Sequence, residues 1–270
     1  MLELRGTRVV HHPGTAAEVV ALDSADLTVP DGQFVTVVGS NGAGKSTLID
    51  VICGSVPLVT GEVLIDGQRL TNVPDYRRAR CVARVFDNPV AGTAAELTIE
   101  ENMALAFSRG ARRRLRFAVH ESRRRLMREK LATVGLGLER RLKEPVMQLS
   151  AGQRQSLTML MASIRSPRIL LCDEHLAALD PRTARAVLGL TVDIARSMGS
   201  STIMVTHNME HAIAVGDRLL VMSGGRIVAD FSENEKQELT SVKLVERIVG
   251  VGDAVSDRML LRKDGAAEVP

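Results

Sequence analysis

The stretch that decides the fold of this 270-residue chain reads Gly39-Ser40-Asn41-Gly42-Ala43-Gly44-Lys45-Ser46. It matches the pattern G-x-x-x-x-G-K-[ST], follows the apolar run 33–38 (QFVTVV) and opens a helical pattern. The glycines let the backbone curl so that successive N–H groups point inward, and the start of a helix adds its positive end at the same place. The stretch therefore predicts a strand, a phosphate-binding loop and a helix, in that order.

This loop predicts a site for a nucleoside triphosphate, which we take to be ATP with Mg²⁺. Lys45 is expected to reach the β- and γ-phosphates, the Ser46 hydroxyl to bind Mg²⁺, and Thr47 to bond a phosphate oxygen further back. A glycine-rich turn that matches by chance is the alternative, and the flanking strand and helix argue against it. The predicted nucleotide-binding residues of the loop are Gly39, Ser40, Asn41, Gly42, Ala43, Gly44, Lys45, Ser46 and Thr47.

Two further runs, 168–172 (RILLC) and 201–205 (STIMV), are apolar on both faces and end in polar residues. Such runs, each followed by a helical pattern, are typical of central strands in a parallel sheet. Ligands of open α/β sheets bind beyond the carboxyl ends of these strands. The three runs therefore predict an α/β fold with one binding edge.

Asp173 and Glu174 follow the second run, and His207 follows the third. We expect Asp173 to hold Mg²⁺ through a water molecule and Glu174 to polarise the water that attacks the γ-phosphoryl group. His207 is expected to bond the γ-phosphate or that water, and His175 also falls near the site. The alternatives are a helix-capping acid pair, since Asp and Glu favour helix starts, and a satisfied histidine of the core or surface.

The rest of the chain divides by pattern. Residues 1–32 and 61–66 predict short strands of a smaller β layer, and 98–147 predicts an Arg-rich helical insertion that includes Arg112–Arg116. Residues 219–230 predict a hairpin around Gly224-Gly225, 240–249 a helix, and 262–270 a frayed polar tail.

Composition bounds the class of protein. Hydrophobic residues make up 45% and charged residues 25%, a globular balance, while aromatics at 2% leave the core to Leu, Val, Ile, Ala and Met. The net charge of +3 and Arg runs without interleaved aromatics argue against nucleic acid. Three scattered cysteines are expected to be buried, reduced and inert. With no secretory pattern in 1–7 and no apolar run of the ~20 residues that a membrane span needs, we expect membrane association only through a partner.

Residues 149–153, Leu-Ser-Ala-Gly-Gln, closely resemble the L-S-G-G-Q signature of ABC ATPases, and they lie between the phosphate loop and the acid pair, as in that family. Ala178-Leu179-Asp180 resembles its D-loop, and residues 85–89, Val-Phe-Asp-Asn-Pro, its Q-loop. The resemblance implies a P-loop NTPase of ABC type with a mainly parallel central sheet, an antiparallel β layer and an inserted helical subdomain. It implies an ATPase domain over 1–230 (core 1–87 and 156–230, helical subdomain about 88–155), followed by a helix and tail over 231–270.

The resemblance also implies roles for single residues. Two copies would pair head to tail, with the signature of one binding the γ-phosphate of ATP held by the other. His11, rather than His12, is the candidate to stack on adenine where the family has an aromatic, and a surface histidine is an equal alternative. Asp87 stands where the family has Gln, as a ligand of Mg²⁺ and a neighbour of the attacking water, and its charge puts the rate in doubt. The implied contacts of the signature and D-loop are Ser150, Ala151, Gly152, Gln153 and Asp180.

The implied function is ATP hydrolysis that powers solute transport through transmembrane permease subunits, most similar to bacterial uptake of amino-acid-like solutes. The expected partners are the permease, a second ATPase protomer and, indirectly, a solute-binding protein, at the cytoplasmic face of the inner membrane. One alternative is a weakly hydrolysing regulatory subunit, which Asp87 favours. The other is a non-transport ABC ATPase, which the absence of tandem units or a coiled-coil insertion disfavours.

Overall fold

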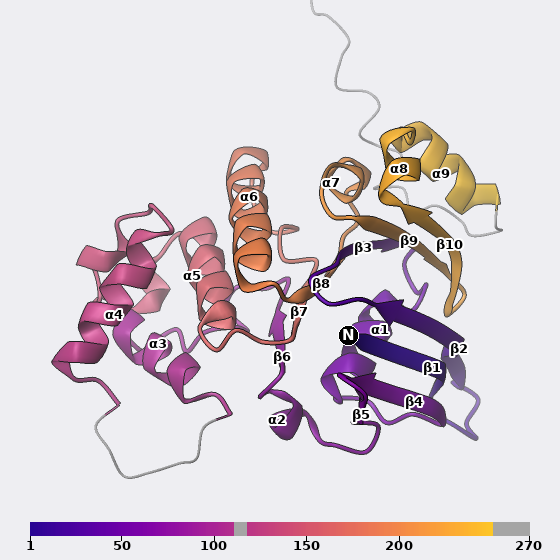
Figure 1. Ribbon diagram of the computed structural model, residues 1–270, viewed down its shortest axis with the longest axis horizontal. Helices are drawn as coiled ribbons and strands as arrows, with labels where there is room; N and C mark the ends of the chain where they lie inside the picture. Colours follow the sequence, from indigo (N-terminus) through magenta and orange to yellow (C-terminus); the bar gives the residue numbers. More distant parts are fainter. Residues whose placement is uncertain (111–117, 251–270) are drawn as a thin grey trace, which may run out of the picture. The chain divides into compact units, whose positions relative to one another are not determined.

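The computed structural model describes residues 1–110 and 118–250, with side chains as far as residue 246 (Figure 1). Contacts divide the chain into two units. Unit 1 holds residues 1–29, 33–72 and those from 204 onward, and unit 2 holds 30–32 and 73–203. The run Arg112–Arg116 and the predicted polar tail lie outside the described residues.

Unit 1 contains an antiparallel sheet in the order β2-β1-β4-β5, so the predicted β layer is confirmed. The prediction of short strands over residues 1–32 is wrong, because two strands of 10 and 11 residues form there. The two strands remain continuous because the pairing changes register instead of ending. Gly6 (φ 53°) and Ser24 (φ 52°) turn the backbone locally at these register shifts. The four strands are β1 Leu2–His11, β2 Val19–Val29, β4 Thr60–Ile65 and β5 Gln68–Arg69.

The first predicted central strand is β3 (Phe34–Gly39), all six residues of which are buried. It pairs in parallel with β9 (Arg218–Ser223), which pairs antiparallel with β10 (Arg226–Ser232) across Gly224-Gly225, so the hairpin is confirmed. The predicted C-terminal helix is also confirmed, and Leu244 packs it against Ala212, Leu219 and Val221. The helices of unit 1 are α1 Lys45–Cys53, α7 Met209–Ala214, α8 Glu233–Gln237 and α9 Ser241–Gly250.

The other two predicted central strands are confirmed as β7 (Ile169–Asp173) and β8 (Ser201–Val205), each fully buried. β7 pairs in parallel with β6 (Val82–Val85) in unit 2. β8 divides between the units, with residues 201–203 in unit 2 and 204–205 in unit 1. Parallel pairing, burial on both faces and helices between strands give the predicted α/β class.

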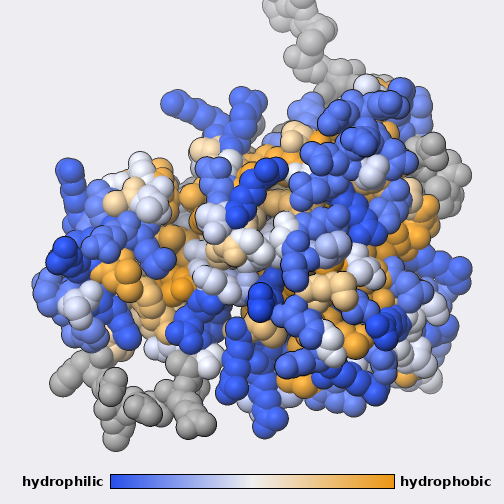
Figure 2. All heavy atoms as spheres, in the orientation of Figure 1, coloured by the Kyte–Doolittle hydropathy of each residue, from blue (hydrophilic) through white to orange (hydrophobic). Residues whose placement is uncertain are grey.

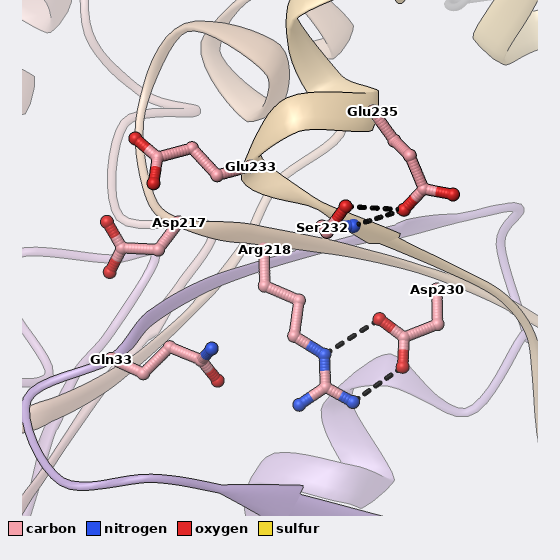
Figure 3. A pocket seen from close by; sticks show the side chains of 7 residues that line it. All are labelled: Gln33, Asp217, Arg218, Asp230, Ser232, Glu233 and Glu235. Atoms are coloured by element: carbon pink, nitrogen blue, oxygen red, sulfur yellow. Dashed lines mark hydrogen bonds and ion pairs between the residues drawn. The ribbon is translucent and has the colours of Figure 1, made fainter.

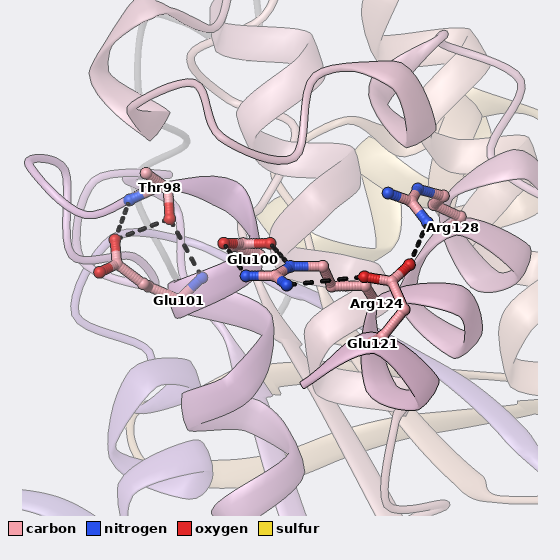
Figure 4. A network of polar contacts seen from close by, with 6 residues as sticks. All are labelled: Thr98, Glu100, Glu101, Glu121, Arg124 and Arg128. Atoms are coloured by element: carbon pink, nitrogen blue, oxygen red, sulfur yellow. Dashed lines mark hydrogen bonds and ion pairs between the residues drawn. The ribbon is translucent and has the colours of Figure 1, made fainter. Parts of the chain in front are cut away.

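The helical part of unit 2 encloses its own core, formed mostly by Leu, Ile, Val, Ala and Met as composition predicts; Met103 and Met127 are fully buried in it. Glu100 and Arg124 tie α3 to α4 through a 2.8 Å ion pair, and Thr98 with Glu101 forms a capping box at the start of α3 (Figure 4). The helices of unit 2 are α2 Asp75–Arg78, α3 Ile99–Ser108, α4 Glu121–Ala132, α5 Ala151–Ser163, α6 Pro181–Met198 and the 3₁₀ turns η1 Leu138–Arg140 and η2 Val146–Gln148.

Apolar side chains reach the surface over α3 and α4 (Figure 2), where Leu105 and Leu126 are exposed. Among the described residues, no helix combines the length and the hydrophobicity that a bilayer crossing requires. The three cysteines, all of which lie in the described part of the chain, form no disulfide. Only Cys172 is buried as expected, whereas Cys53 and Cys81 are half-buried. Burial raises the pKa of the Cys172 thiol well above its usual range, which keeps it protonated and unreactive.

Candidate nucleotide-binding site

The phosphate loop lies in unit 1 between β3 and α1, as predicted. Gly44 takes the left-handed conformation (φ 95°) at the N-cap of α1, and its backbone passes so close to Ala21 that a Cβ would lie 2.4 Å from the Ala21 carbonyl oxygen. Gly39 is equally confined, because a Cβ there would lie 2.2 Å from the carbonyl oxygen of Met222. Glycine is therefore required at both ends of the loop by close packing as well as by conformation.

Lys45 is buried within this loop, with its Nζ donating to the carbonyl oxygens of Gly39 (2.8 Å) and Ser40 (2.7 Å). The ammonium group is thereby held at the concave side of the loop, where a phosphate would be bound. Ser46 is exposed on the first turn of α1, and no side chain caps this turn. The start of α1, with a cation and a hydroxyl beside it, is a suitable environment for a polyphosphate.

Two of the predicted histidines also belong to unit 1. The Thr206 N–H donates to Val37 O (3.1 Å), which fixes the segment after β8, and half-buried His207 follows it. His11 is half-buried at the end of β1, paired with Val19 of β2. His12 is exposed at φ 52° and serves a tight turn, which is consistent with the preference for His11 over His12 as the adenine neighbour.

The acid pair lies in unit 2 at the end of β7. Asp173 is buried, and its Oδ2 accepts a 2.6 Å hydrogen bond from Arg84 of β6. Glu174 is half-buried and adopts φ 47°, in the left-handed region that costs a residue with a side chain of the order of 1–3 kcal/mol. Such strain at the predicted catalytic glutamate is typical of a functional position.

His175, expected near the site because it follows Glu174, has a structural environment in the core of unit 2. Its side chain is 1% exposed, and its Nε2 lies 2.9 Å from the hydroxyl oxygen of Thr191 on α6. Because that hydroxyl already donates to Val187 O, it accepts from the imidazole N–H. His175 thus anchors the chain that leaves Glu174.

The signature residues surround the start of α5 in unit 2. Ser150 is the N-cap: its Oγ accepts from the Gln153 N–H at 3.2 Å, and the Gln153 side chain accepts from the Ser150 N–H at 3.1 Å. Ala151 is helical, so its replacement of glycine costs nothing in backbone strain. Gly152 is needed, because a Cβ there would lie 2.2 Å from the methyl group of Thr183. The exposed Ser150 hydroxyl and the first N–H groups of α5 form a second potential phosphate contact.

Asp180 and Asp87 are both exposed in unit 2. Asp180 is the N-cap of α6, and hydrogen bonds from the Thr183 side chain and from the Thr183 and Arg182 N–H groups lower the pKa of the carboxyl group. Asp87 lies two residues after the end of β6, next to Phe86, whose carbonyl oxygen accepts from Gln155 of α5 (3.1 Å). The Q-loop and the signature helix are therefore hydrogen-bonded within one unit.

The donor set fits Mg²⁺ of the kind bound with a nucleotide. Among the described residues, no three His, Cys, Asp or Glu side chains cluster as a metal-binding cage. Mg²⁺ uses one or two carboxylates, water and substrate phosphates rather than such a cage. Ser46 and Asp173 offer the hydroxyl and carboxylate oxygens that this mode of binding needs.

A separate groove of about 500 Å³ in unit 1 has no predicted site residue in its lining (Figure 3). Its wall carries Asp217, Asp230, Glu233 and Glu235 against the single cation Arg218, which pairs with Asp230. This excess of carboxylates repels phosphate, so the groove is not the nucleotide site.

Comparison with known proteins identifies the class to which this fold and these loops belong. The family model described as ABC transporter matches residues 22–177, which is more than half of the chain. The chain belongs to the ABC transporter family, and it is a nucleotide-binding ATPase of that family.

Particular relatives are consistent with this assignment. The chain is 40% identical to the tyrosine transport ATP-binding protein of Clostridioides difficile, over 87% of this chain and 91% of that protein. It is 31% identical to the methionine import ATP-binding protein MetN of Corynebacterium efficiens, over 98% of this chain and 73% of that protein. A dimeric ATP-binding cassette solved in a post-hydrolysis state with ADP and Pi has a TM-score of 0.74 and 26% identity, covering 86% of this chain and 99% of that one. The predicted ABC-type cassette fold is confirmed.

Arg84 and Gln155 were missed as candidate site residues by sequence reasoning. A charged residue within the otherwise apolar β6 was the available signal for Arg84. Gln155 lies two residues after the signature stretch 149–153, and its residue type gave no signal of its contact with the Q-loop.

Proposed function

We propose that this chain hydrolyses ATP to drive import of an amino-acid-like solute through a membrane permease. The observation that carries the proposal is the 40% identity, over nearly the full length of both chains, to a protein named for tyrosine transport. The methionine import relative supports the same solute class. On this proposal the chain is peripheral at the cytoplasmic side of the membrane, and it is held there by the permease.

The proposed catalytic arrangement assigns a separate role to each of these residues. The loop with Lys45 binds the phosphates, and Ser46, Asp173 and Asp87 would hold Mg²⁺, which supplies positive charge to the β- and γ-phosphates when bound.

Glu174 acts as the base that orients and deprotonates the attacking water, and His207 bonds the γ-phosphate. Asp180 of the D-loop contacts the same nucleotide from across the interface between two copies of the chain.

We propose that the site is completed by a second copy. The exposed Ser150 at the start of α5 has its cap bonds made within the helix, and the first N–H groups of α5 are oriented for an anion from outside. The dimeric cassette with ADP and Pi supports pairing of this kind.

The helical part of unit 2 is the proposed docking surface for the permease. Leu105 and Met147 are 57% and 60% exposed, and Leu97 is also exposed. The Leu97 carbonyl oxygen accepts from the Val146 N–H, which brings Leu97 close to the segment that carries Met147. Apolar side chains gathered in this way favour burial by a partner protein. An indirect partnership with a solute-binding protein follows from an import role.

The regulatory alternative has one observation in its favour. Asp87 places a carboxylate where the family has a neutral Gln, and added negative charge beside a developing anionic transition state slows hydrolysis. The strained, retained Glu174 and the intact phosphate loop favour the enzyme. We therefore keep hydrolysis as the proposed function and slow hydrolysis as its competitor.

Steady-state ATPase activity of the purified chain, beside Glu174→Gln and Asp87→Gln, tests the proposal. We expect turnover by the unchanged chain and a loss of about 100-fold or more in Glu174→Gln. Activity only in Asp87→Gln would favour the regulatory alternative. Uptake of labelled tyrosine and methionine into vesicles carrying the chain with its permease tests the solute class, with spermidine as the comparison, and no uptake of either amino acid would reject it.

A further inference from the structure

Arg84 contacts the predicted metal-binding carboxylate of Asp173 through a short ion pair. Its Nη2 donates to Asp173 Oδ2 at 2.6 Å, and the two side chains are only 19% and 12% exposed. β6 and β7 run in parallel with Arg84 opposite Leu171, two residues before Asp173, so the pairing of the strands brings the guanidinium to the carboxylate. A short bond between opposite charges at low exposure is among the stronger side-chain contacts in proteins.

The guanidinium group is also held by the Q-loop aromatic. The Cζ of Arg84 lies 4.9 Å from the centre of the Phe86 ring, a distance typical of a cation–π contact. Phe86 is fixed in turn by its carbonyl oxygen, which accepts from fully buried Gln155 of the signature helix. Arg84 is therefore positioned by three elements, and a flexible lysine could not reproduce this stacked, directional contact.

The charge of Arg84 has a consequence for any cation that Asp173 binds. A guanidinium bonded to a carboxylate offsets part of its negative charge and repels a divalent ion approaching the same group. At the same time it holds the carboxylate in one orientation. If the ion pair only stabilises the fold and no metal approaches Asp173, its charge has no effect on nucleotide binding. The two interpretations therefore differ in the metal dependence of nucleotide binding.

We propose that Arg84 is a positioning residue that orients Asp173 and, through its charge, lowers the Mg²⁺ affinity of the nucleotide site. This inference rests on the proposed role of Asp173 at the metal. On this proposal, Arg84 sets how strongly nucleotide binding depends on Mg²⁺ in a site that also carries the carboxylate of Asp87.

The test measures the affinity of the purified chain for a fluorescent trinitrophenyl-ATP, once with saturating Mg²⁺ and once with EDTA. We expect Arg84→Met to raise the ratio of the two affinities on the order of tenfold, because a cation near a divalent ion has been removed. Arg84→Gln, which is neutral but can still donate to Asp173, should raise it similarly. Arg84→Lys should restore the ratio to within about threefold, because the charge remains.

Arg124→Met is the matched control, since Arg124 also pairs with a low-exposure carboxylate of unit 2, Glu100, on the helices of Figure 4. We expect no change in its ratio. If Arg84→Met and Arg84→Gln give the same ratio of nucleotide affinities as the unchanged chain, the proposal is overturned and the contact is a structural ion pair. If Arg84→Met does not fold, the comparison of Arg84→Gln with Arg84→Lys decides the question. If the unchanged chain hydrolyses no ATP, the proposed function is rejected but this inference is not. If the unchanged chain binds nucleotide with the same affinity with and without Mg²⁺, the role of Asp173 is rejected together with this inference.

Discussion

Single residues of the phosphate loop are set by backbone packing as much as by the ligand. Gly44 has both a left-handed conformation and a neighbouring carbonyl oxygen in the space that a Cβ would fill. Gly42 has a similar conformation (φ 80°) but nothing within 4 Å of such a Cβ. The two glycines therefore separate conformational strain from steric overlap within one loop.

We predict that Gly44→Ala lowers the free energy of unfolding by about 2–4 kcal/mol, because strain and overlap add. Gly42→Ala is the matched variant and should cost about 1 kcal/mol, from strain alone. Chemical denaturation measures both. Equal losses would contradict the close approach of Gly44 to Ala21.

Lys236 of α8 is a second residue whose environment predicts a measurable effect. It is 3% exposed, and its Nζ donates to the carbonyl oxygens of Val215 and Gly216. Burial lowers its pKa from 10.5 to about 8, against the opposing pull of Asp217 and Glu233. Between these two values the unfolded chain holds a proton that the folded protein has lost, so the free energy of unfolding rises with pH there.

The expected outcome is that the stability of the unchanged chain, relative to Lys236→Met, rises from pH 8 toward pH 10.5 and is level below pH 8. Denaturation of both proteins across this range, at constant ionic strength, measures the difference. Parallel pH profiles would show that Lys236 keeps its ordinary pKa in the fold.

Among the elements, α3 and α5 begin in the same way, with a capping box formed by Thr98 and Glu101 in one and Ser150 and Gln153 in the other. Both boxes stabilise a helix start, but only the second belongs to the signature. The sequence motif therefore combines a structural cap with the proposed phosphate contact. A substitution that keeps the cap and changes the charge can separate the two roles.

Ser150→Asp is such a substitution, because Asp is a favoured N-cap but its carboxylate repels a phosphate. We predict stability within about 0.5 kcal/mol of the unchanged chain, together with a loss of ATPase activity of at least tenfold. Thr98→Ser, at the equivalent cap of α3, should keep both properties, because its hydroxyl can still accept from the Glu101 N–H and donate to the Glu101 carboxylate. A loss of stability in Ser150→Asp that matched its loss of activity would assign Ser150 a structural role alone.

Across the whole molecule, the proposed site residues divide between two units: the phosphate loop and His207 in one, and the acid pair and signature in the other. If the signature serves the nucleotide of a second copy, ATP should promote association, and a chain that cannot hydrolyse should remain associated.

For Glu174→Gln we predict that ATP with Mg²⁺ converts the 29.2 kDa chain to a species of twice that mass, measured by light scattering. The same variant carrying Ser150→Asp should stay monomeric, because the phosphate contact between copies is lost. If the double variant associates as strongly as Glu174→Gln, the signature does not belong to the interface between the two copies.

Much of this fold and site could be predicted from the chain alone, because the signals are local. The loop 39–46, the buried runs that became β3, β7 and β8, and the hairpin at Gly224-Gly225 each depend on neighbouring residue types that restrict the backbone in the same way in any context. The signature could be recognised for the same reason. In contrast, the length of β1 and β2 could not be predicted, because bulges interrupt the alternation without ending the strands.

The partners of buried polar groups were decided by packing between distant segments. Arg84 meets Asp173 across 89 positions of sequence, through the pairing of β6 with β7. His175 finds Thr191 on the following helix, which makes it an anchor instead of a ligand contact, and Gly152 is required by a methyl group of α6. Motif spacing holds no information about such contacts, because they arise only when strands and helices are brought together and each buried polar group must find a partner.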